Sequence, residues 1–465
     1  MESFDLAVIG AGPGGYVASI RAAQLGLRVA LIEKEATLGG TCLNVGCIPS
    51  KALLESSELY YQAKHAFPSH GITTGPVEFD LTKMMARKDQ VVEELTKGIG
   101  MLMKKNKIKV LKGRGRPAGQ GRVAVGRDDR TEEIEAKNIL LAMGGVPIEL
   151  PFLPFDGKHI VTSTEALSFD RVPGHLIVVG AGAVGLELGS VWNRLGAQVT
   201  VIEMLPTIIP FADRQVAKAL EKSLTKQGLA FRLKSKVTGA EIDGDTISVS
   251  VQNDKDGTES ITCDKLLVAI GRRPLIEGVG LEEAGVRTDP SGRIEVDDRL
   301  QTSVPGVYAI GDLVQGPMLA HKAEAEGVAV AEQIAGKPGH VNYQAIPSVV
   351  YTWPEVAQVG VTEEEAKAQS LPIKSGRYYM KANARAKCMG EEDGLVKVIS
   401  HADTDRLLGI HILGPHASEL IAEAVMAFEF GGSAEDVGRT VHAHPTLSET
   451  MKEAALAVER RQIHG

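Results

Sequence analysis

One pattern of residues occurs twice in this chain and constrains its fold more than any other feature. In the first copy an apolar segment at 4–9 leads into GAGPGG at 10–15, a helical pattern runs from 16 to 25, and a second apolar segment ends at Glu33. The glycines allow a tight turn and a close approach to a pyrophosphate at the helix N-terminus, while the acid accepts a ribose hydroxyl. The complete pattern therefore predicts a dinucleotide-binding fold.

The second copy begins 170 residues later (180 − 10). An apolar segment from Leu176 leads into GAGAVG at 180–185, and Glu203 follows Gly180 by 23 residues, the interval that also separates Glu33 from Gly10. Two such patterns predict two dinucleotide folds and two bound dinucleotides. No arginine follows Glu203 closely, and its carboxylate would repel a 2′-phosphate, so the second fold is predicted to prefer NAD to NADP.

Two cysteines separated by four residues predict redox chemistry. Cys42 and Cys47 lie in GGTCLNVGCIPSK at 39–51. Positions five apart in an uninterrupted helix diverge, whereas a disulfide needs Cα atoms within roughly 7 Å, so a bridge requires a distorted backbone, which we expect where a helix begins. A helix N-terminus would also lower the pKa of a cysteine. The pair is therefore interpreted as exchangeable.

Two other interpretations of the cysteine pair are weaker. A structural disulfide across four residues would constrain the unfolded chain little, and nothing indicates an oxidising compartment. A zinc site needs about four ligands at characteristic spacings, and the nearest histidines, His65 and His70, have no partner cysteine pair. No metal is therefore predicted. Cys263 and Cys388 stand alone and are predicted to be small buried residues.

Composition and charge argue against several classes of function. The chain has 465 residues, of which 4% are aromatic, and a formal net charge of −8. This acidic balance and the few aromatic residues argue against nucleic-acid binding. No membrane-spanning segment is indicated, and the acidic N-terminus runs directly into a strand without the features of a secretory signal. A cytoplasmic location is predicted.

The segment from residue 347 onward differs from the rest. Apolar segments at 349–351, 396–399 and 407–412 read as strands, and helix-favouring stretches follow at 418–430 and 448–461. The turn residues between the last two strands predict an antiparallel hairpin. The predicted fold class is therefore α/β, with two Rossmann-like domains followed by a C-terminal α+β domain.

Two further side chains are candidates for a site. His444 precedes a proline and lies five residues before Glu449, which could orient its ring and increase its basicity. Thiol chemistry needs a base that titrates near neutrality, so His444 is a candidate, with His442 as its rival. Asp312 ends an apolar strand and could meet a cofactor hydroxyl, or could equally cap a helix.

Together these motifs resemble those of the pyridine nucleotide-disulfide oxidoreductases, and within that family the members that oxidise dihydrolipoamide. The resemblance spans nearly the whole chain and is carried by GGTCLNVGCIPSK, both glycine patterns, GRRP at 271–274, GD at 311–312, MLAH at 318–321 and HAHPTLSE at 442–449. It implies an enzyme of 2-oxo acid dehydrogenase complexes that oxidises protein-bound dihydrolipoamide through a redox-active disulfide and FAD and passes hydride to NAD⁺.

The resemblance also implies domains and cofactor sites. The implied domains are an FAD-binding domain at 1–149, an NAD-binding domain at 150–275, a central domain at 276–346 that completes the FAD site, and a dimerisation domain at 347–465. The residues expected at FAD are Gly10, Gly12, Gly15, Glu33, Lys34, Gly40, Thr41, Lys51, Gly115, Met143, Gly144, Asp312, Met318, Leu319, Ala320 and His321. Those expected at NAD are Gly180, Gly182, Gly185, Glu187, Glu203, Val237 and Gly271.

The resemblance further implies roles and partners. Cys42 would exchange with the substrate, Cys47 would lie against the flavin, and Lys51 would lie near the reactive flavin nitrogen with Glu187 as its ion partner. His444 and Glu449 would form the acid–base pair, contributed by the other subunit of a homodimer. The implied partners are the lipoyl domains and the peripheral-subunit-binding domain of an acyltransferase.

One departure and two alternatives remain. The family usually has Ala-Thr-Gly-Ser where this chain has Ala-Met-Gly-Gly at 142–145, so two hydroxyl groups are lost. A glutathione-type reductase would share the cysteine pair but prefer NADP and basic residues after the second acid. A non-catalytic flavoprotein subunit would leave the presence of Cys42, Cys47 and His444 together unexplained.

Overall fold

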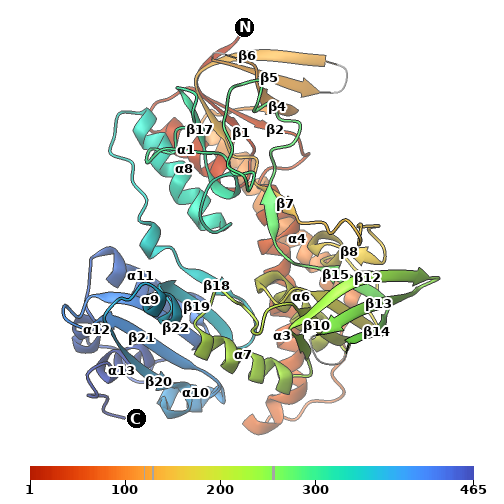
Figure 1. The fold of residues 1–465 in the computed structure, drawn as a ribbon, viewed down its shortest axis with the longest axis vertical. Coiled ribbons are helices and arrows are strands. Elements are labelled where there is room, and N and C mark those ends of the chain that lie inside the picture. Colours follow the sequence, from red (N-terminus) through yellow and green to blue (C-terminus); the bar gives the residue numbers. More distant parts are fainter. Residues whose placement is uncertain (120, 128–129, 254–256, 465) are drawn as a thin grey trace. The chain divides into compact units, whose positions relative to one another are not determined.

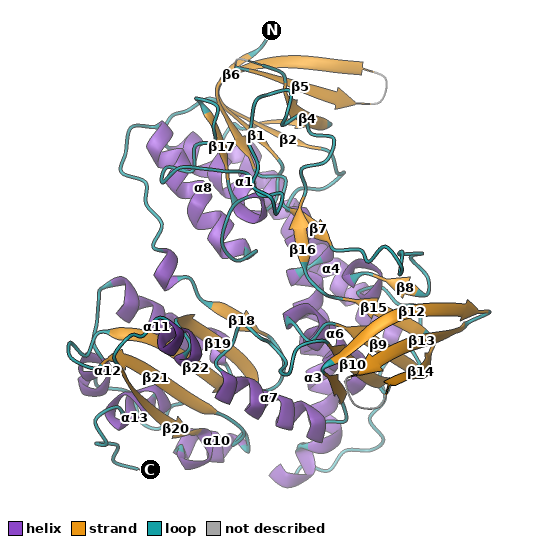
Figure 2. Cartoon of the chain, in the orientation of Figure 1, coloured by secondary structure: helices purple, strands orange, loops and turns teal. Residues whose placement is uncertain are grey.

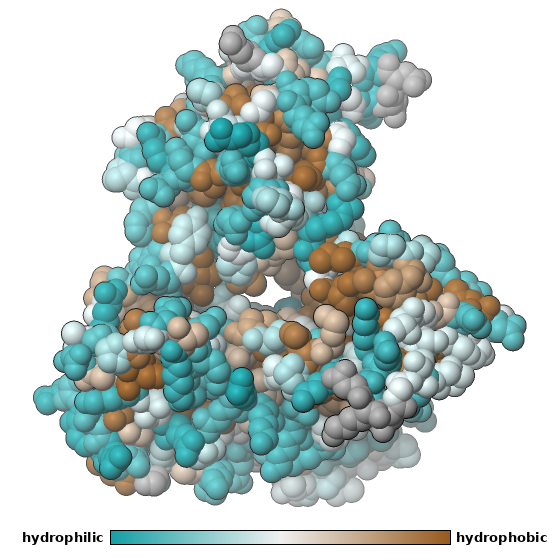
Figure 3. Space-filling model, viewed as in Figure 1, coloured by the Kyte–Doolittle hydropathy of each residue, from teal (hydrophilic) through white to brown (hydrophobic). Residues whose placement is uncertain are grey.

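The computed structural model describes residues 1–119, 121–127, 130–253 and 257–464, and the chain divides into two compact units (Figure 1). The first unit contains 1–52, 85–148 and 271–341, and the second contains 53–84, 149–270 and 342–465. The four-domain division remains a prediction. Among the described residues, no helix is both long and apolar enough to cross a membrane. Hydrophilic residues cover much of the face seen in Figure 3, with separate hydrophobic areas between them.

The first unit is built on a seven-stranded sheet in the order β3-β2-β1-β6-β5-β4, with β17 also paired to β6. Its strands are β1 (Ser3–Ile9), β2 (Val29–Glu33), β3 (Lys109–Lys112), β4 (Arg114–Pro117), β5 (Arg122–Arg127), β6 (Arg130–Leu141) and β17 (Val307–Ala309). The helices α1 (Pro13–Gln24) and α8 (Ala320–Ile334) pack against each other beside this sheet (Figure 2). The strand β2 reads as a continuous apolar run because it is buried on both faces.

Two short strands of the first unit stand outside this sheet. They are β7 (Gly145–Pro147) and β16 (Arg272–Pro274), which pair antiparallel with each other. The single-turn helix η2 (Gly311–Leu313) follows β17 directly. Of the predicted flavin residues, η2 carries Asp312, and Met143 and Gly144 directly precede β7.

The second unit repeats the arrangement of the first at the predicted offset. Its parallel sheet has the order β11-β10-β9-β15-β8, in which β10-β9-β15 corresponds to β2-β1-β6. The strands are β8 (Ile160–Val161), β9 (His175–Val179), β10 (Gln198–Glu203), β11 (Ala230–Leu233) and β15 (Lys265–Val268). The helices are α5 (Ser163–Ala166), α6 (Ala183–Arg194) and α7 (Arg214–Lys226). The separate antiparallel sheet contains β12 (Ser235–Asp243), β13 (Thr246–Asn253) and β14 (Gly257–Cys263).

The C-terminal part of the second unit is the predicted α+β domain. Its antiparallel sheet has the order β18-β19-β22-β21-β20, and the predicted hairpin is the pair β21–β22. The strands are β18 (Ser348–Val350), β19 (Glu355–Gly360), β20 (Ile373–Tyr379), β21 (Leu395–His401) and β22 (Leu407–Gly414). The helices are α9 (Glu363–Ala368), α10 (Ala384–Met389), α11 (Ala417–Glu429), α12 (Ala434–Arg439) and α13 (Glu449–Ala457), and the single-turn helices are η3 (Tyr343–Ala345) and η4 (Met380–Ala382). The predicted fold class is thus confirmed.

The helices between β2 and β3 are α2 (Gly40–Val45), α3 (Cys47–His65), η1 (Phe67–His70) and α4 (Leu81–Lys105). One cysteine prediction is wrong: Cys263 is buried at 4% exposure, but Cys388 is exposed, because the short helix α10 buries Ala386 and not Cys388. The predicted C-terminal helix also ends early, since α13 stops at Ala457.

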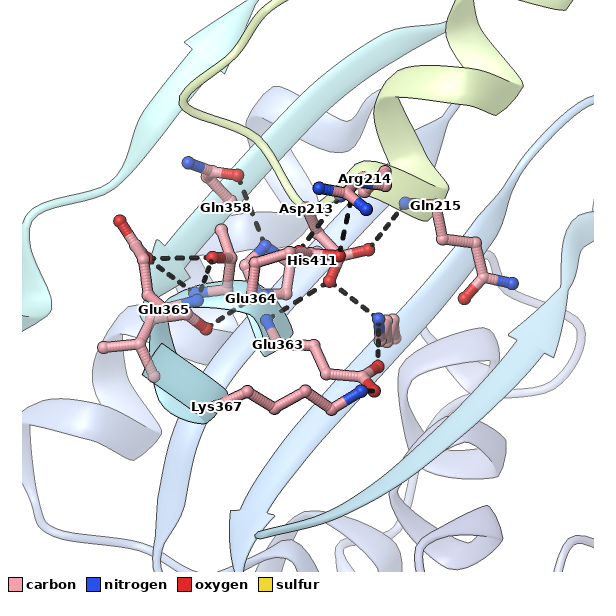
Figure 4. Close-up of polar contacts among 12 residues, drawn as sticks. Asp213, Arg214, Gln215, Gln358, Glu363, Glu364, Glu365, Lys367 and His411 are labelled. Atoms are coloured by element: carbon pink, nitrogen blue, oxygen red, sulfur yellow. Dashed lines mark hydrogen bonds and ion pairs between the residues drawn. The ribbon is translucent and has the colours of Figure 1, made fainter. Parts of the chain in front are cut away.

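A buried cluster of charges attaches α7 to the C-terminal sheet (Figure 4). Asp213, which caps α7, is fully buried, and its Oδ2 lies 2.7 Å from the Nζ of Lys397 on β21. The same Nζ lies 2.6 Å from Oε2 of Glu363 on α9. His411 on β22 is buried beside them and hydrogen-bonds to Gln358, while burial lowers its pKa. Lys397 therefore bridges two carboxylates, of which Glu363 is also paired with Lys367.

We expect Lys397→Met to destabilise the second unit by about 3–5 kcal/mol, because removing one member of a buried ion pair leaves a buried charge without compensation. The measurement is the denaturant midpoint of unfolding. The control is Lys374→Met on the neighbouring strand β20, which breaks the exposed ion pair between Lys374 and Glu459 and should change the midpoint little. An equal effect of both substitutions would contradict the role of the cluster.

The loss of stability caused by Lys397→Met should become smaller at acidic pH. Hydrogen bonds from Lys367 and Lys397 lower the pKa of Glu363 from 4.5 to about 2. A carboxylate with a lowered pKa contributes stability above its unfolded pKa and loses that contribution as the pH falls through the folded value. The difference between wild type and Lys397→Met should therefore narrow between about pH 4.5 and pH 2.

Candidate active site

The first glycine turn has a backbone that only glycine can adopt without strain. Gly10 has φ +103°, and a Cβ on it would lie 2.4 Å from the Ala142 carbonyl oxygen. A Cβ on Gly15 would lie 1.9 Å from the Gly10 carbonyl oxygen. Helix α1 starts at Pro13 with Gly12 as its N-cap and no side-chain cap, so its first N–H groups are directed toward a ligand position. The turn fits a pyrophosphate.

The second glycine turn reproduces this geometry. Gly180 also has φ +103°, and its Cβ would lie 2.5 Å from the Ala269 carbonyl oxygen, while a Cβ on Gly185 would lie 2.2 Å from the Gly180 carbonyl oxygen. Gly182 is the N-cap of α6, again without a side-chain cap. The residues present therefore fit a dinucleotide at each of the two turns.

The two predicted ribose acids are held in the same way. Glu33 accepts hydrogen bonds from the N–H groups of Ala11 at 2.8 Å and Glu35 at 2.9 Å. Glu203 accepts from the N–H groups of Ala181 and Leu205, both at 2.8 Å. Each carboxylate is thus fixed at the end of its strand beside the glycine turn, the position that a ribose hydroxyl requires.

A cavity lies beyond the second acid. It has a volume of about 430 Å³ and is lined by Met204, Lys234, Ser235, Lys236, Gln252 and Asn253. The N–H of Lys234 donates to the Leu205 carbonyl at 3.2 Å, which brings the β11–β12 turn to the loop that follows Glu203. These two lysines were not expected from the sequence, because they follow Glu203 by about thirty residues. The two lysines place positive charge near the predicted adenosine ribose and would attract a 2′-phosphate. The predicted preference for NAD therefore depends on the carboxylate of Glu203, which would repel that phosphate.

We expect Glu203→Arg to shift the coenzyme preference toward NADP. The substitution removes a carboxylate that repels the 2′-phosphate and adds a cation beside Lys234 and Lys236. The ratio of kcat/KM for NAD to that for NADP should fall at least about tenfold, which corresponds to roughly 1.4 kcal/mol of differential binding. Glu241→Arg, an exposed charge reversal on β12, is the control. An unchanged ratio in Glu203→Arg would contradict the ribose assignment.

The remaining predicted flavin residues are partly explained by packing. A Cβ on Gly40 would lie 2.7 Å from the Cα of Gly12, so these two glycines let α2 touch the pyrophosphate turn. A Cβ on Gly115 would lie 3.0 Å from the Ile32 side chain, which accounts for glycine there without a ligand. Thr41 and Lys34 are both exposed, and Lys34 lies 3.4 Å from Glu35.

Asp312 is not a helix cap. Its side chain belongs to the first turn of η2, whose N-cap is Ile310. Burial raises the pKa of Asp312 against the opposing charges of Arg272 and Lys322, and the Nε of Arg272 lies 3.9 Å from its carboxylate. A Cβ on Gly145 would lie 2.9 Å from Oδ2 of Asp312, so the glycine that departs from the family pattern makes room for this carboxylate.

The other predicted cofactor residues lie on several elements. Gly144 has φ +73°, Val237 is buried on β12, and Gly271 has φ +125°. The start of α8 has no side-chain cap and is formed by Met318, Leu319, Ala320 and His321. Met143 packs against the core of the first unit. Glu187 on α6 accepts a hydrogen bond from the Tyr351 N–H at 3.0 Å. Lys51 belongs to the first unit and Glu187 to the second, and their ion pair remains a prediction.

The backbone is broken between the two cysteines, as predicted. Helix α2 ends at Val45, Gly46 has φ −142° and ψ −114°, and α3 begins at Cys47. A Cβ on Gly46 would lie 2.8 Å from the Thr41 carbonyl oxygen and 3.3 Å from the Cys42 Cα. This glycine therefore allows the chain to fold back and bring the two cysteines together.

The expectation that a helix N-terminus lowers the pKa of a cysteine is wrong for Cys42. A hydrogen bond with the Cys47 side chain, followed by burial, raises the pKa of Cys42, whereas the positive charge of Lys51 opposes the shift. Cys42 lies within α2, whereas the new helix starts at Cys47. A second negative charge beside the first is unfavourable, so the pair carries one thiolate at most. All four cysteines are thiols in the structure, and the predicted disulfide remains a prediction.

The structure separates the two candidate histidines. The Nε2 of His442 lies 2.7 Å from Oε1 of Glu423, and its Nδ1 lies 2.9 Å from the Thr440 carbonyl oxygen. Two acceptors require both ring nitrogens to carry protons, and the Glu423 hydrogen bond raises the pKa of His442. A histidine held as imidazolium cannot accept a proton, so His442 is unsuited to be the base.

His444 has the arrangement of a base. Its Nδ1 lies 2.9 Å from Oε1 of Glu449, and its side chain is 72% exposed. A proton on Nδ1 directed at the carboxylate leaves Nε2 able to accept one. Burial acts against the ionised form of Glu449, but hydrogen bonds from the Thr446 N–H and from His444 outweigh it and lower the pKa of Glu449. The carboxylate thus stays ionised and orients the ring.

The structure groups the predicted catalytic residues into two sets. Cys42, Cys47 and Lys51 belong to the first unit, while His444, Glu449 and Glu187 belong to the second. Among the described residues, no cluster of histidine, cysteine, aspartate and glutamate side chains could hold a metal ion.

Comparison with known proteins identifies the family. The model for pyridine nucleotide-disulphide oxidoreductases matches residues 4–327, and the model for their dimerisation domain matches 346–455. The chain is 50% identical to "Dihydrolipoyl dehydrogenase 1, mitochondrial" of Arabidopsis thaliana, over 99% of this chain and 91% of that protein. It is 50% identical to "Dihydrolipoyl dehydrogenase" of Cupriavidus necator, over 100% of this chain and 99% of that protein.

A solved structure has the same fold. LpdA from Mycobacterium tuberculosis superposes with a TM-score of 0.90 at 27% sequence identity and covers 98% of this chain and 99% of its own. The matched families, the two nucleotide folds and the C-terminal sheet domain agree over nearly the whole length. The chain belongs to the pyridine nucleotide-disulphide oxidoreductase family.

Proposed function

We propose that this protein is an FAD- and NAD-dependent enzyme that oxidises protein-bound dihydrolipoamide to lipoamide, as a component of a 2-oxo acid dehydrogenase complex. The observation that carries the proposal is the Cys42–Cys47 pair, hydrogen-bonded across a helix break on the segment that touches the first glycine turn. Two relatives that are 50% identical over nearly the full length are named dihydrolipoyl dehydrogenase, which favours this substrate over glutathione.

The residues of the chain supply proton transfer and thiol exchange. With the pair oxidised, Nε2 of His444 takes a proton from dihydrolipoamide, and the resulting thiolate attacks the Sγ of Cys42. A bond forms between the substrate sulfur and Cys42, the Cys42–Cys47 bond breaks, and Cys47 leaves as the thiolate. The second substrate thiol then passes its proton to Cys42 as its sulfur displaces the Cys42 Sγ: the S–S bond of lipoamide forms, the bond between substrate and Cys42 breaks, Cys42 is left as the thiol and Cys47 as the thiolate.

Charges in the first unit stabilise the thiolate on Cys47. Burial lowers the pKa of Arg272, and the charges of Asp312 and Cys47 act against that shift, while the positive charge of Lys51 acts to lower the pKa of Cys42. Hydrogen bonding and burial raise the pKa of Cys42, so the negative charge belongs on Cys47. FAD would be held at the first glycine turn with Glu33 and NAD⁺ at the second with Glu203, and when bound they would supply the acceptor for the electron pair of the dithiol.

The test is an anaerobic titration of the purified, FAD-loaded protein. Dihydrolipoamide should change the visible flavin spectrum, and NAD⁺ should then restore it, whereas reduced glutathione should produce no change and NADP⁺ should restore it poorly. A spectrum that responds to glutathione would favour the glutathione-type alternative. A flavin spectrum indifferent to every dithiol would favour a non-catalytic flavoprotein subunit.

The proposed assembly is a homodimer in which each subunit supplies His444 and Glu449 to the cysteines of the other. The match to a dimerisation domain at 346–455 supports dimerisation. Two large apolar side chains near His444 in the sequence, Phe430 and Val441, are 81% and 91% exposed, as expected for a surface that a second copy covers. Sedimentation of the wild type should give twice the chain mass.

The proposed partners and compartment follow from the activity. Lipoyl domains deliver the substrate, and the peripheral-subunit-binding domain of an acyltransferase holds the enzyme, so both should bind to the homodimer. The proposed compartment is the cytoplasm. The Arabidopsis relative is named mitochondrial, so cell fractionation distinguishes the two compartments.

A further inference from the structure

Lys322 and Glu326 form an ion pair that is completely buried. They lie one turn apart on α8, the Nζ of Lys322 is 2.9 Å from Oε1 of Glu326, and both side chains are 0% exposed. The attraction between two such charges often fails to offset the cost of removing both from water, and an apolar pair of similar size can pack at least as well. Stability alone is therefore a weak explanation for this pair.

The pair holds both backbone groups of a single residue. The N–H of Gly311 donates to Oε2 of Glu326 at 2.7 Å, and the Nζ of Lys322 donates to the Gly311 carbonyl oxygen at 3.1 Å. Gly311 has φ +71°, a left-handed conformation that favours glycine. Because the peptide groups on both sides of Gly311 are fixed, the direction in which the next residue, Asp312, leaves the turn is fixed as well.

The adjacent face of α8 is fixed against the pyrophosphate turn. A Cβ on Gly327 would lie 2.6 Å from the Gly14 carbonyl oxygen, and a Cβ on Gly14 would lie 3.0 Å from the Ala323 carbonyl oxygen. These glycines let the backbones of α1 and α8 approach closely, as the two adjacent helices in Figure 2 illustrate. One rigid helix therefore holds the start of α1 with one face and the Gly311–Asp312 turn with the next.

Arg272 and Gly145 also limit where the Asp312 carboxylate can lie. The Nε of Arg272 lies 3.9 Å from its carboxylate, and a Cβ on Gly145 would lie 2.9 Å from the same Oδ2. The cationic groups that act on Asp312 are thus Arg272 from β16 and Lys322 from α8. A small rotation at Gly311 would change the distance from this carboxylate to both cations and to the position of a ligand.

We propose that Lys322 and Glu326 are positioning residues for FAD: they set the location of the Asp312 carboxylate relative to the N-terminus of α1. This inference rests on the proposed function, in which α1 holds the pyrophosphate of FAD and Asp312 meets a hydroxyl of the same cofactor. The pair is completely buried and acts through Gly311 and Asp312. Its contribution is pre-organisation, which lowers the ordering cost of binding.

The experiment replaces the pair by apolar residues of similar size in the full-length chain. The double variant Lys322→Met/Glu326→Leu should bind FAD at least about tenfold more weakly, the cost of misplacing one hydrogen bond to a charged group. Its dissociation constant for FAD is measured by titrating the FAD-depleted protein and following flavin fluorescence. Glu93→Leu/Lys97→Met, which replaces an exposed ion pair of the same spacing on α4, is the matched control and should leave FAD binding unchanged.

Two further measurements separate positioning from general stability. The NAD dissociation constant of the FAD-depleted variant should stay close to the wild-type value, whereas its unfolding midpoint should fall, because the Gly311 N–H and carbonyl lose their hydrogen-bond partners. In an Asp312→Ala background, the pair replacement should change FAD binding less than about twofold, because the residue through which the pair acts is gone. A full tenfold loss in that background would overturn the proposal, and so would unchanged FAD binding in the double variant.

A milder variant keeps the test decisive if the double variant does not fold. Glu326→Gln retains the size of the side chain and an acceptor for the Gly311 N–H but removes the negative charge opposite Lys322. Glu326→Gln should weaken FAD binding in the chain that retains Asp312 and leave it unchanged in the Asp312→Ala variant. The same weakening in both chains would overturn the proposal. A wild-type protein that binds no FAD would instead refute the proposed function.

Discussion

Cys42→Ser should lose dihydrolipoamide oxidation by at least about a thousandfold while FAD stays bound. A serine hydroxyl can neither form the bridge to Cys47 nor exchange with a substrate thiolate, because the chemistry depends on sulfur as both electrophile and leaving group. Steady-state reduction of NAD⁺ by dihydrolipoamide measures the loss, and the flavin absorbance of the purified variant measures cofactor retention. Near-normal turnover in Cys42→Ser would contradict the exchange scheme.

Two matched controls sharpen this result. Cys388→Ser removes an exposed thiol in the second unit and should leave turnover unchanged, which excludes a general effect of losing a cysteine. Cys47→Ser should also abolish turnover, but it leaves Cys42 without the hydrogen bond that contributes most to its raised pKa. Alkylation of Cys42 should therefore become faster at neutral pH in Cys47→Ser than in the reduced wild type.

The features that could be predicted from the sequence are those set by local backbone geometry. Gly10 and Gly180 follow a strand, begin a helix turn and have the same φ, and the acid after each second strand accepts the same backbone N–H. A break between Cys42 and Cys47 was also predictable, since an intact helix cannot bring these positions together. Each of these inferences needs only a stretch of about thirty residues.

The features that could not be predicted depend on residues distant in the sequence. Lys234 and Lys236 reach the end of β10 only because β11 pairs beside it, which no spacing after Glu203 indicates. The raised pKa of Cys42 depends on its contact with Cys47 and on burial, and neither follows from its place near a helix start. The exposure of Cys388 likewise depends on which face of α10 meets the core.

The histidine pair shows this limit within four residues of sequence. His442 and His444 both lie in HAHP and both have an acidic partner, so the sequence alone ranks them poorly. The structure separates them through Glu423, which lies nineteen residues before His442, and through the Thr440 carbonyl. With both nitrogens donating, His442 is a fixed cation that ties its loop to α11, whereas His444 retains an accepting nitrogen.

His444→Ala should therefore slow the thiol half-reaction by about 10²–10⁴-fold, the usual contribution of a general base, and leave the exchange between NADH and flavin within about twofold of wild type. Rapid mixing of the oxidised variant with dihydrolipoamide measures the first process, and NADH oxidation by ferricyanide measures the second. Equal losses in both would mean that the histidine supports the fold and not proton transfer.

His442→Gln is the discriminating comparison for this experiment. Glutamine can still donate to Glu423 but cannot carry the positive charge, so the loop should loosen while the Nε2 of His444 remains able to accept a proton. The thiol half-reaction should then fall far less than in His444→Ala, and a higher dithiol concentration should recover part of the loss, because positioning and not proton transfer is impaired. A larger loss in His442→Gln than in His444→Ala would reverse the assignment of the base, since only the residue that accepts the proton limits the chemical step at saturating dithiol.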